Sequence, residues 1–100
     1  MIIKIPFNSQ FIMPIARGQK IYTTRTKKYG KVGDYFYVGN KRGLKCIIMG
    51  IQRMKLDEIA EKFWWQEGFH SKEEFIGFWL IIHRKWTPDK MVYLHSFRRI

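Results

Sequence analysis

Three residues of this sequence, Lys20, Thr23 and Glu67, are of the types that carry out acyl transfer. A threonine hydroxyl is a potential nucleophile, but it needs a neighbouring group that takes its proton. Lys20 could be this base if burial lowers its pKa, and Glu67 could hold the lysine or shuttle the proton. Arg25 could stabilise an oxyanion. The same groups also suit binding alone, because Lys20 and Arg25 can meet a phosphate or a base edge while Glu67 accepts a hydrogen bond from an exocyclic amine.

The strand that must carry these residues poses a geometric problem. Side chains three positions apart in a regular strand point to opposite faces, so Lys20 and Thr23 would not converge. Thr23 would share its face with Arg25, and Lys20 would share its face with Thr24. Convergence requires that Lys20 precede the regular pleat, directly after a turn at Gly18, or that a bulge intervene.

A lysine-rich loop follows this strand and contains Lys27, Lys28, Tyr29 and Lys31. Lysine beside an aromatic ring suits single-stranded nucleic acid, because an unpaired base stacks on the ring for roughly 1–3 kcal/mol. The whole chain carries 19 Lys and Arg residues against 8 Asp and Glu, a formal net charge of +11. A field of this sign favours polyanions, nucleic acid first, although basic composition can also serve solubility alone. We therefore predict that this loop binds nucleic acid together with Lys20 and Arg25.

Composition argues against several other classes of protein. Cys46 is the only cysteine, so an intramolecular disulfide and a thiolate metal cluster are impossible, and its apolar neighbours predict a buried thiol in a reducing compartment. The histidines, His70, His83 and His95, lack metal-ligand spacing, so we expect structural or surface roles and neither a metal nor a cofactor. No apolar run approaches the roughly 20 residues that cross a bilayer, and the N-terminus does not resemble a signal peptide. We expect a soluble cytoplasmic protein without a membrane partner.

Hydrophobic periodicity predicts five strands and three helices in a single domain, residues 1–100. Residues typical of strands occur at 2–7, 20–25, 34–38, 44–52 and 91–97. Helical spacing of apolar residues occurs at 9–17, from 55 onward, and after Ser71, where Ser71 and Glu74 have the form of a capping box. Residues 39–43 are predicted to be a hairpin connection with Lys41 and Arg42 at its tip. A small sheet built of hairpins favours a curled or closed five-stranded barrel, which avoids exposed edges.

The tryptophans beside Glu67 allow two interpretations. One ring of Trp64 and Trp65 is expected to pack in the core. The other could wall a cleft and raise the pKa of the neighbouring carboxyl group. Trp79 and Trp86 are expected to be core or helix-packing residues rather than ligand contacts.

The sequence also resembles the ASCH family in three motifs. Residues 18–25 (Gly-Gln-Lys-Ile-Tyr-Thr-Thr-Arg), followed by Gly-Asp at 33–34, are similar to the family pattern Gly-x-Lys-Thr-x-Thr-x-Arg…Gly-Asp. Residues 67–75 (Glu-Gly-Phe-His-Ser-Lys-Glu-Glu-Phe) resemble its second motif, a glutamate ahead of a helix, and residues 91–97 resemble its closing strand. These motifs occur in the right order over nearly the whole chain. One departure is Ile21, which stands where the family pattern has its first threonine.

The resemblance implies an α+β fold, namely a PUA-like, five-stranded, mostly antiparallel β-barrel with flanking helices. ASCH proteins are generally regarded as RNA-binding or RNA-associated, so the resemblance implies RNA or a nucleoside as the partner. One branch looks like small amidohydrolases that act on N4-acetylcytidine through a lysine, a threonine and a glutamate. By this resemblance those roles would fall on Lys20, Thr23 and Glu67, with Arg25 nearby.

Our leading hypothesis is therefore an RNA-binding ASCH domain whose basic cleft accommodates single-stranded RNA or a nucleoside. The alternative is an enzyme that uses Lys20, Thr23 and Glu67, either as an amidohydrolase on N4-acetylcytidine-type nucleosides or as an RNA-cleaving hydrolase. A third possibility is a module that binds an acidic protein through its basic face. The first two hypotheses require the segment after Gly18 to meet Glu67 across a shared hollow. The oligomeric state does not follow from the sequence.

Overall fold

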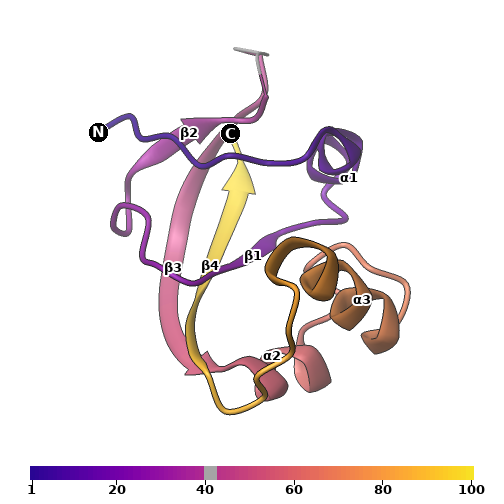
Figure 1. The fold of residues 1–100 in the computed structure, drawn as a ribbon. Coiled ribbons are helices and arrows are strands. Elements are labelled where there is room, and N and C mark those ends of the chain that lie inside the picture. Colours follow the sequence, from indigo (N-terminus) through magenta and orange to yellow (C-terminus); the bar gives the residue numbers. More distant parts are fainter. Residues whose placement is uncertain (40–42) are drawn as a thin grey trace.

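The computed structural model describes residues 1–39 and 43–100, so the predicted hairpin tip with Lys41 and Arg42 lies outside the described residues. The described residues form an α+β fold in which a curled antiparallel sheet has its helices gathered along one side (Figure 1). Burial alternates along Tyr35–Tyr37 and at the start of Lys45–Lys55, as in strands with one buried face, whereas the neighbouring residues Thr23 and Thr24 are both buried.

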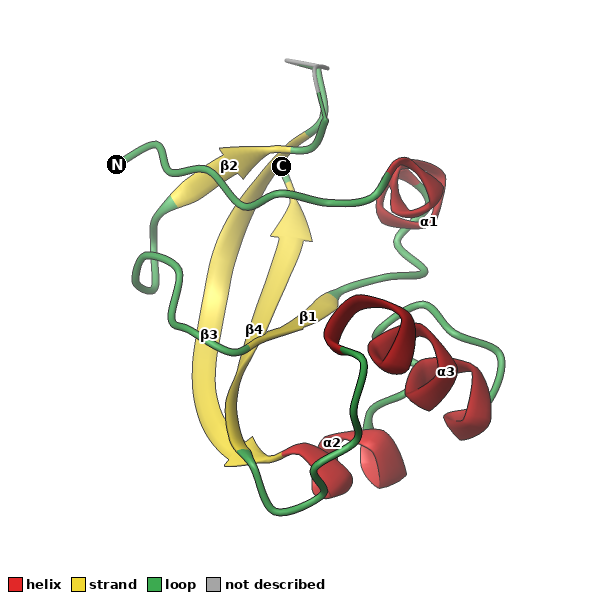
Figure 2. Cartoon of the chain, in the orientation of Figure 1, coloured by secondary structure: helices red, strands yellow, loops and turns green. Residues whose placement is uncertain are grey.

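The sheet has the strand order β1-β4-β3-β2, and every neighbouring pair is antiparallel. Its strands are β1 (Tyr22–Arg25), β2 (Tyr35–Tyr37), β3 (Lys45–Lys55) and β4 (Met91–Arg99). The two long strands, β3 and β4, form a curved central ribbon that runs along the molecule (Figure 2). The register between them shifts between Ile48 and Gly50, and such an irregularity bends a strand.

The predicted strand at residues 2–7 is wrong. Only Ile2 forms a bridge, and it does so in parallel with Tyr35. Pro6 has no backbone N–H to donate to a ladder, and the chain turns into a short 3-10 helix at Ser9. Over the described ranges the sheet therefore has four strands rather than five. We expected a curled or closed five-stranded barrel, and the sheet is curled into a half-barrel (Figure 1).

The helices are the 3-10 helix Ser9–Phe11 and the α-helices α1 (Ile12–Ala16), α2 (Leu56–Lys62) and α3 (Lys72–His83). The start of α3 confirms the predicted cap, because the side chain of Ser71 accepts a hydrogen bond from Glu74 N at 3.0 Å. The carboxylate of Glu74 in turn accepts from His70 N at 3.3 Å. α3 ends at Arg84, whose φ of 64° is the left-handed conformation that commonly terminates a helix.

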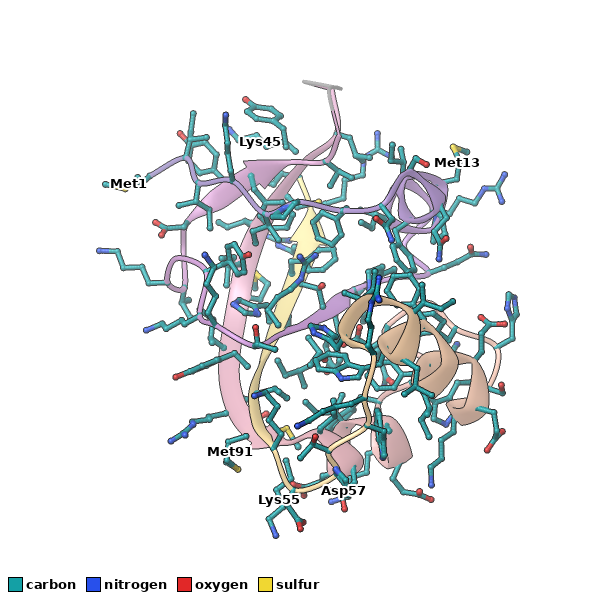
Figure 3. The ribbon with its side chains drawn as sticks, viewed as in Figure 1. Met1, Met13, Lys45, Lys55, Asp57 and Met91 are labelled. Carbon is teal, nitrogen blue, oxygen red and sulfur yellow. The ribbon has the colours of Figure 1, made fainter. Side chains whose placement is uncertain are left out.

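The core lies where the sheet, α2 and α3 bury their apolar side chains against each other, as the sticks of Figure 3 illustrate. Cys46 is fully buried there, as predicted. Aromatic contacts link the N-terminal segment to α3. The Phe11 ring meets Phe69 and Phe78 edge-on, with ring centroids 5.7 and 5.1 Å away. The helices of the described ranges include none that is both long and apolar enough to span a membrane.

Candidate functional site

Backbone hydrogen bonds join the segment that carries Lys20 to the segment that carries Glu67. The N–H groups of Ile21 and Tyr22 both donate to the carbonyl of Gln66, at 2.8 and 3.0 Å. Gly18, with a φ of 75°, makes the turn after α1 that delivers the chain to this position. Because β1 begins only at Tyr22, Lys20 precedes the regular pleat.

The ammonium group of Lys20 is buried and its hydrogen-bonding capacity is used up. Its Nζ donates to Tyr22 O at 2.9 Å, to Glu67 O at 2.8 Å and to Glu67 Oε1 at 3.3 Å. The residue is 3% exposed, and Nζ lies 4.6 Å from the centroid of the Phe11 ring. Burial lowers the pKa of Lys20, and the attraction of Glu67 opposes this shift. Since an ammonium has three N–H donors, this one is suited to fixing Glu67 in place.

The carboxylate of Glu67 receives a hydrogen bond on each oxygen. Oε1 faces Lys20, and Oε2 accepts from Thr24 Oγ1 at 2.5 Å. Gly68 allows this close packing: its φ is 94°, and a Cβ there would lie 3.0 Å from the Cβ of Lys20. Thr24 was not among the residues we predicted for the site. The alternation rule that placed Lys20 and Thr24 on one face contained the signal that could have found it.

Thr23 belongs to a second group, on the other side of the strand. Its Oγ1 accepts from Arg25 Nε at 3.0 Å, and Arg25 Nη2 also donates to Pro6 O at 2.6 Å. The guanidinium carbon lies 4.9 Å from the centroid of the Phe7 ring, a cation–π contact. Burial lowers the pKa of Arg25. The structure therefore pairs Thr23 with Arg25, while Glu67 accepts hydrogen bonds from both Lys20 and Thr24.

A pocket of about 350 Å³ brings the two groups together. Of the predicted residues, those that line it are Lys20, Thr23, Arg25, Lys27, Tyr29 and Glu67. Lys28 and Lys31 are exposed on the same loop but are not lining residues. The walls are mainly aromatic and come from the N-terminal segment, the turn after Glu67 and α3: Phe7, Phe11, Phe69, Phe75, Phe78 and Trp79. The pocket thus has polar groups set into an apolar cavity, which is typical of small-ligand sites.

The aromatic residues in and near α3 confirm one part of the sequence prediction and correct another. Trp79, predicted to be a core residue, is buried but also lines the pocket, and the His83 ring stacks on it with centroids 3.9 Å apart. His83 also lines the pocket. Trp64 packs against the core and Trp65 is exposed, and neither lines the cavity. The aromatic wall that we expected from Trp64 or Trp65 is therefore formed by other residues, of the N-terminal segment, the turn after Glu67 and α3.

His95, in β4, forms a hydrogen bond with the loop that carries Lys27 and Tyr29. Its fully buried ring accepts a hydrogen bond from Tyr29 N at Nε2 (3.0 Å), and Nδ1 lies 3.3 Å from Thr23 O. An acceptor at Nε2 requires the neutral ring with its proton on Nδ1, directed at the Thr23 carbonyl. Burial lowers the pKa of His95, which keeps this form. Lys27 in turn places its Nζ 5.0 Å from the centroid of the Tyr29 ring.

Solved structures share this fold. The hypothetical protein PH0355 aligns with a TM-score of 0.78 at 18% identity, over 100% of both chains. The ASCH domain from Lactobacillus crispatus aligns with a TM-score of 0.60 at 18% identity, over 87% of this chain and 68% of that one. A variant of the ASCH protein ZmASCH from Zymomonas mobilis aligns with a TM-score of 0.71 at 13% identity, over 97% of this chain and 68% of that one. No protein-family model matches the sequence, and no curated protein matches it either.

These likenesses define the class of fold. The chain has the fold of an ASCH domain, as the three sequence motifs led us to expect. At identities below 20% they establish the fold and leave the activity to be argued from the pocket.

Proposed function

We propose that this protein binds single-stranded RNA and holds one unstacked base of it, or a free nucleoside, in the pocket beside Glu67. The observation that carries the proposal is the combination found in one cavity: a buried carboxylate, aromatic walls, and Arg25 and Lys27 among the lining residues. Its volume of about 350 Å³ lies at the small end of the roughly 300–1,000 Å³ of ligand pockets. That space suits a single nucleoside and not a duplex.

The two neighbouring threonines give the pocket a fixed hydrogen-bonding polarity. The hydroxyl proton of Thr24 is donated to Glu67, so Thr24 can only accept from a ligand. Thr23 already accepts from Arg25, and its own O–H can donate to a ligand. A base edge with an amine next to a ring nitrogen, as in cytosine and adenine, matches an acceptor side formed by Glu67 and Thr24 and a donor at Thr23.

The basic loop supplies the part of the affinity that does not depend on base identity. Lys27 and Tyr29 line the pocket, and Lys28 and Lys31 are exposed on the same loop. Phosphates on either side of the bound base would meet these lysines. Such contacts release counterions, so the affinity must fall steeply with salt.

Fluorescence anisotropy with a labelled single-stranded RNA oligonucleotide tests the proposal. We expect binding that weakens with salt, a marked preference over duplex RNA, and loss of affinity in Lys27→Ala and Lys28→Ala variants. Each lysine removed should reduce the slope of log affinity against log salt by about 1. Lys62→Ala is the matched control, because Lys62 pairs with Glu58 on α2 and does not line the pocket. Equal affinity for single-stranded and duplex RNA would contradict a base-binding pocket.

A second candidate function is hydrolysis of an acylated nucleoside such as N4-acetylcytidine. It is favoured by one observation: Lys20, Thr23 and Glu67 all line the same pocket, and burial lowers the pKa of Lys20. In this mechanism the neutral form of Lys20 takes the hydroxyl proton of Thr23 as Thr23 attacks the acyl carbon, and it returns that proton to the amine of the base as the C–N bond breaks. Water then hydrolyses the acyl ester on Thr23, which releases acetate and restores the hydroxyl. Incubation with N4-acetylcytidine separates the candidates. Release of acetate that is abolished by Thr23→Val would support the enzyme, whereas no release above the buffer rate would leave binding alone.

A further inference from the structure

The outer face of α3 is a second feature of this chain, separate from the pocket. The helix lies at the periphery of the molecule (Figure 1) and directs Phe75 and Trp79 into the core. At 100° per residue, Gly77 lies at the centre of the opposite face, and Leu80 and Ile81 flank it. Leu80 is 41% exposed and Ile81 is 76% exposed. Two large aliphatic side chains therefore face outward around a glycine.

Nothing in this fold requires glycine at position 77. A Cβ there would meet no atom within 4 Å, and Gly77 is not among the glycines of positive φ. Glycine in the interior of a helix is destabilising relative to alanine. What glycine does permit on such a face is the close approach of another backbone.

The charges on this face are arranged by sign along the helix. Glu73 and Glu74 lie in the first turn of α3, and Arg84 and Lys85 follow its last turn, all four exposed. An identical helix that ran in the opposite direction would place its basic end beside this acidic end, and its acidic end beside this basic end. The register that pairs position 73 with position 84 also places Leu80 of one copy over Gly77 of the other.

We propose that α3 is a homodimer interface, in which two copies pair antiparallel about a two-fold axis that passes midway between Gly77 and Leu80. In such an interface each contact occurs twice. The symmetry therefore requires a helix face that is complementary to an identical face running in the opposite direction. An anionic membrane or a uniformly acidic peptide fits less well, because Glu73 and Glu74 would repel it at one end of the helix. This inference does not depend on the proposed RNA function.

The size of the face sets the strength of the dimer. α3 has 12 residues and spans about 18 Å, so one helix face from each copy buries less than the roughly 1,200 Å² of a standard interface. The net charge of +11 on each copy adds a general repulsion. We expect a reversible dimer with a dissociation constant of about 10–100 µM at physiological salt, where the Debye length of about 8 Å screens distant charges. The inner side of the same helix lines the pocket, so the dimer would hold two pockets on opposite sides of the helix pair.

Sedimentation velocity over a roughly hundredfold range of concentration measures the monomer–dimer equilibrium and so tests this interface. The decisive comparison is between wild type and charge-reversed variants. Glu73→Lys and Arg84→Glu should each weaken the dimer about tenfold or more, because each places like charges opposite one another in both copies of the contact. An equimolar mixture of the two variants should associate again as a heterodimer, since position 73 of each chain then faces an opposite charge at position 84 of the other. The antiparallel register predicts both the loss in each single variant and the recovery in the mixture, whereas a parallel pair would already place like charges opposite one another in wild type and predicts no such loss.

The apolar part of the face has its own test. Leu80→Ser should abolish the dimer, while Lys4→Ser, a control on the exposed N-terminal segment, should leave it unchanged. Thermal unfolding of each variant checks that its fold persists, as we expect for exposed positions. A wild-type chain that stays monomeric over the whole range, or a dimer that none of these variants weakens, would overturn the proposal.

Discussion

Thr24 Oγ1 donates a hydrogen bond of 2.5 Å to Oε2 of Glu67, a residue 43 positions further along the chain. With Lys20 on the other carboxylate oxygen, this bond fixes the one acidic group of the pocket in a single orientation. The hydroxyl proton that it uses also decides which hydrogen bonds Thr24 can offer a ligand. The polarity of the pocket therefore depends on a contact between the first strand and the turn after α2.

Thr24→Val, which replaces the hydroxyl by a methyl group of similar size, should destabilise the fold by about 1–3 kcal/mol, because one oxygen of a buried carboxylate loses its donor. The free energy of unfolding in urea measures this effect. Thr24→Ser is the control, since it retains the donor and should stay much closer to wild type. A Thr24→Val variant as stable as wild type would show that the hydrogen bond from Thr24 to Glu67 does not stabilise the fold.

Lys20→Met should cost about 3–5 kcal/mol, because it leaves the Glu67 carboxylate buried without its cation. The double variant Lys20→Met/Glu67→Gln removes both charges and should be more stable than Lys20→Met alone. A double-mutant cycle from urea unfolding measures this coupling. Additive effects of the two substitutions would mean that the contact of 3.3 Å contributes no net interaction.

The thiol of Cys46 predicts a loss of stability in alkaline solution. Burial raises its pKa from 9.0 to about 11. Between these two values the unfolded chain gives up the thiol proton while the folded chain keeps it, so unfolding becomes easier as the pH rises through this range. The comparison must be with Cys46→Ala, because the lowered pKa of Lys20 acts in the opposite direction at high pH.

The free energy of unfolding in urea should thus fall more between about pH 9 and about pH 11 in wild type than in Cys46→Ala. Alkylation by iodoacetamide gives a second measurement. The folded protein should resist it at neutral pH, because the thiol is buried and protonated, and it should react on denaturation. Rapid alkylation of the folded chain would contradict both statements.

His95 predicts the opposite behaviour in acid. Its pKa is lowered from 6.5 in the folded state, so below that value the unfolded chain binds a proton more readily than the folded one. Stability is then present above about pH 6.5 and is lost as the pH falls. Protonation of Nε2 also removes the acceptor of Tyr29 N, which should release the loop that carries Tyr29.

Hydrogen exchange at the Tyr29 amide, followed by NMR from about pH 7 to about pH 5, checks this prediction after correction for intrinsic exchange. Protection should decrease with acidification in wild type and should already be low in His95→Leu, which has no acceptor. The pKa of His83 is also lowered by burial, and His95→Leu leaves that residue unchanged. If the protection of the Tyr29 amide in wild type does not vary with pH, protonation of His95 does not release the loop.

Much of this fold follows from local sequence signals. The capping box at Ser71 predicts the start of α3, and β-branched and aromatic residues predict the strands of the antiparallel sheet. The strand expected at residues 2–7 failed because its β-branched residues favour an extended chain without ensuring a partner along its length. Pro6 removes one donor, and a single bridge at Ile2 is what forms.

The pocket was only partly predictable. The resemblance to ASCH domains brought Lys20 and Glu67 to notice, and the alternation of side chains gave the face that Lys20 shares with Thr24. The contributions of Trp79, His83 and His95 could not be found in this way. Each depends on how α3 and β4 are placed relative to β1, and that is decided by tertiary contacts between distant segments.

Amide chemical-shift mapping during titration with nucleosides tests the central claim most directly. On addition of cytidine or adenosine, we predict saturable shifts at Thr23, Thr24 and Glu67 that are much weaker with uridine, and that Glu67→Leu abolishes. Shifts confined to Lys27, Lys28 and Lys31, with the pocket amides unmoved by every nucleoside and by single-stranded RNA, would contradict the account, because they would leave only a charged surface and no pocket for a base.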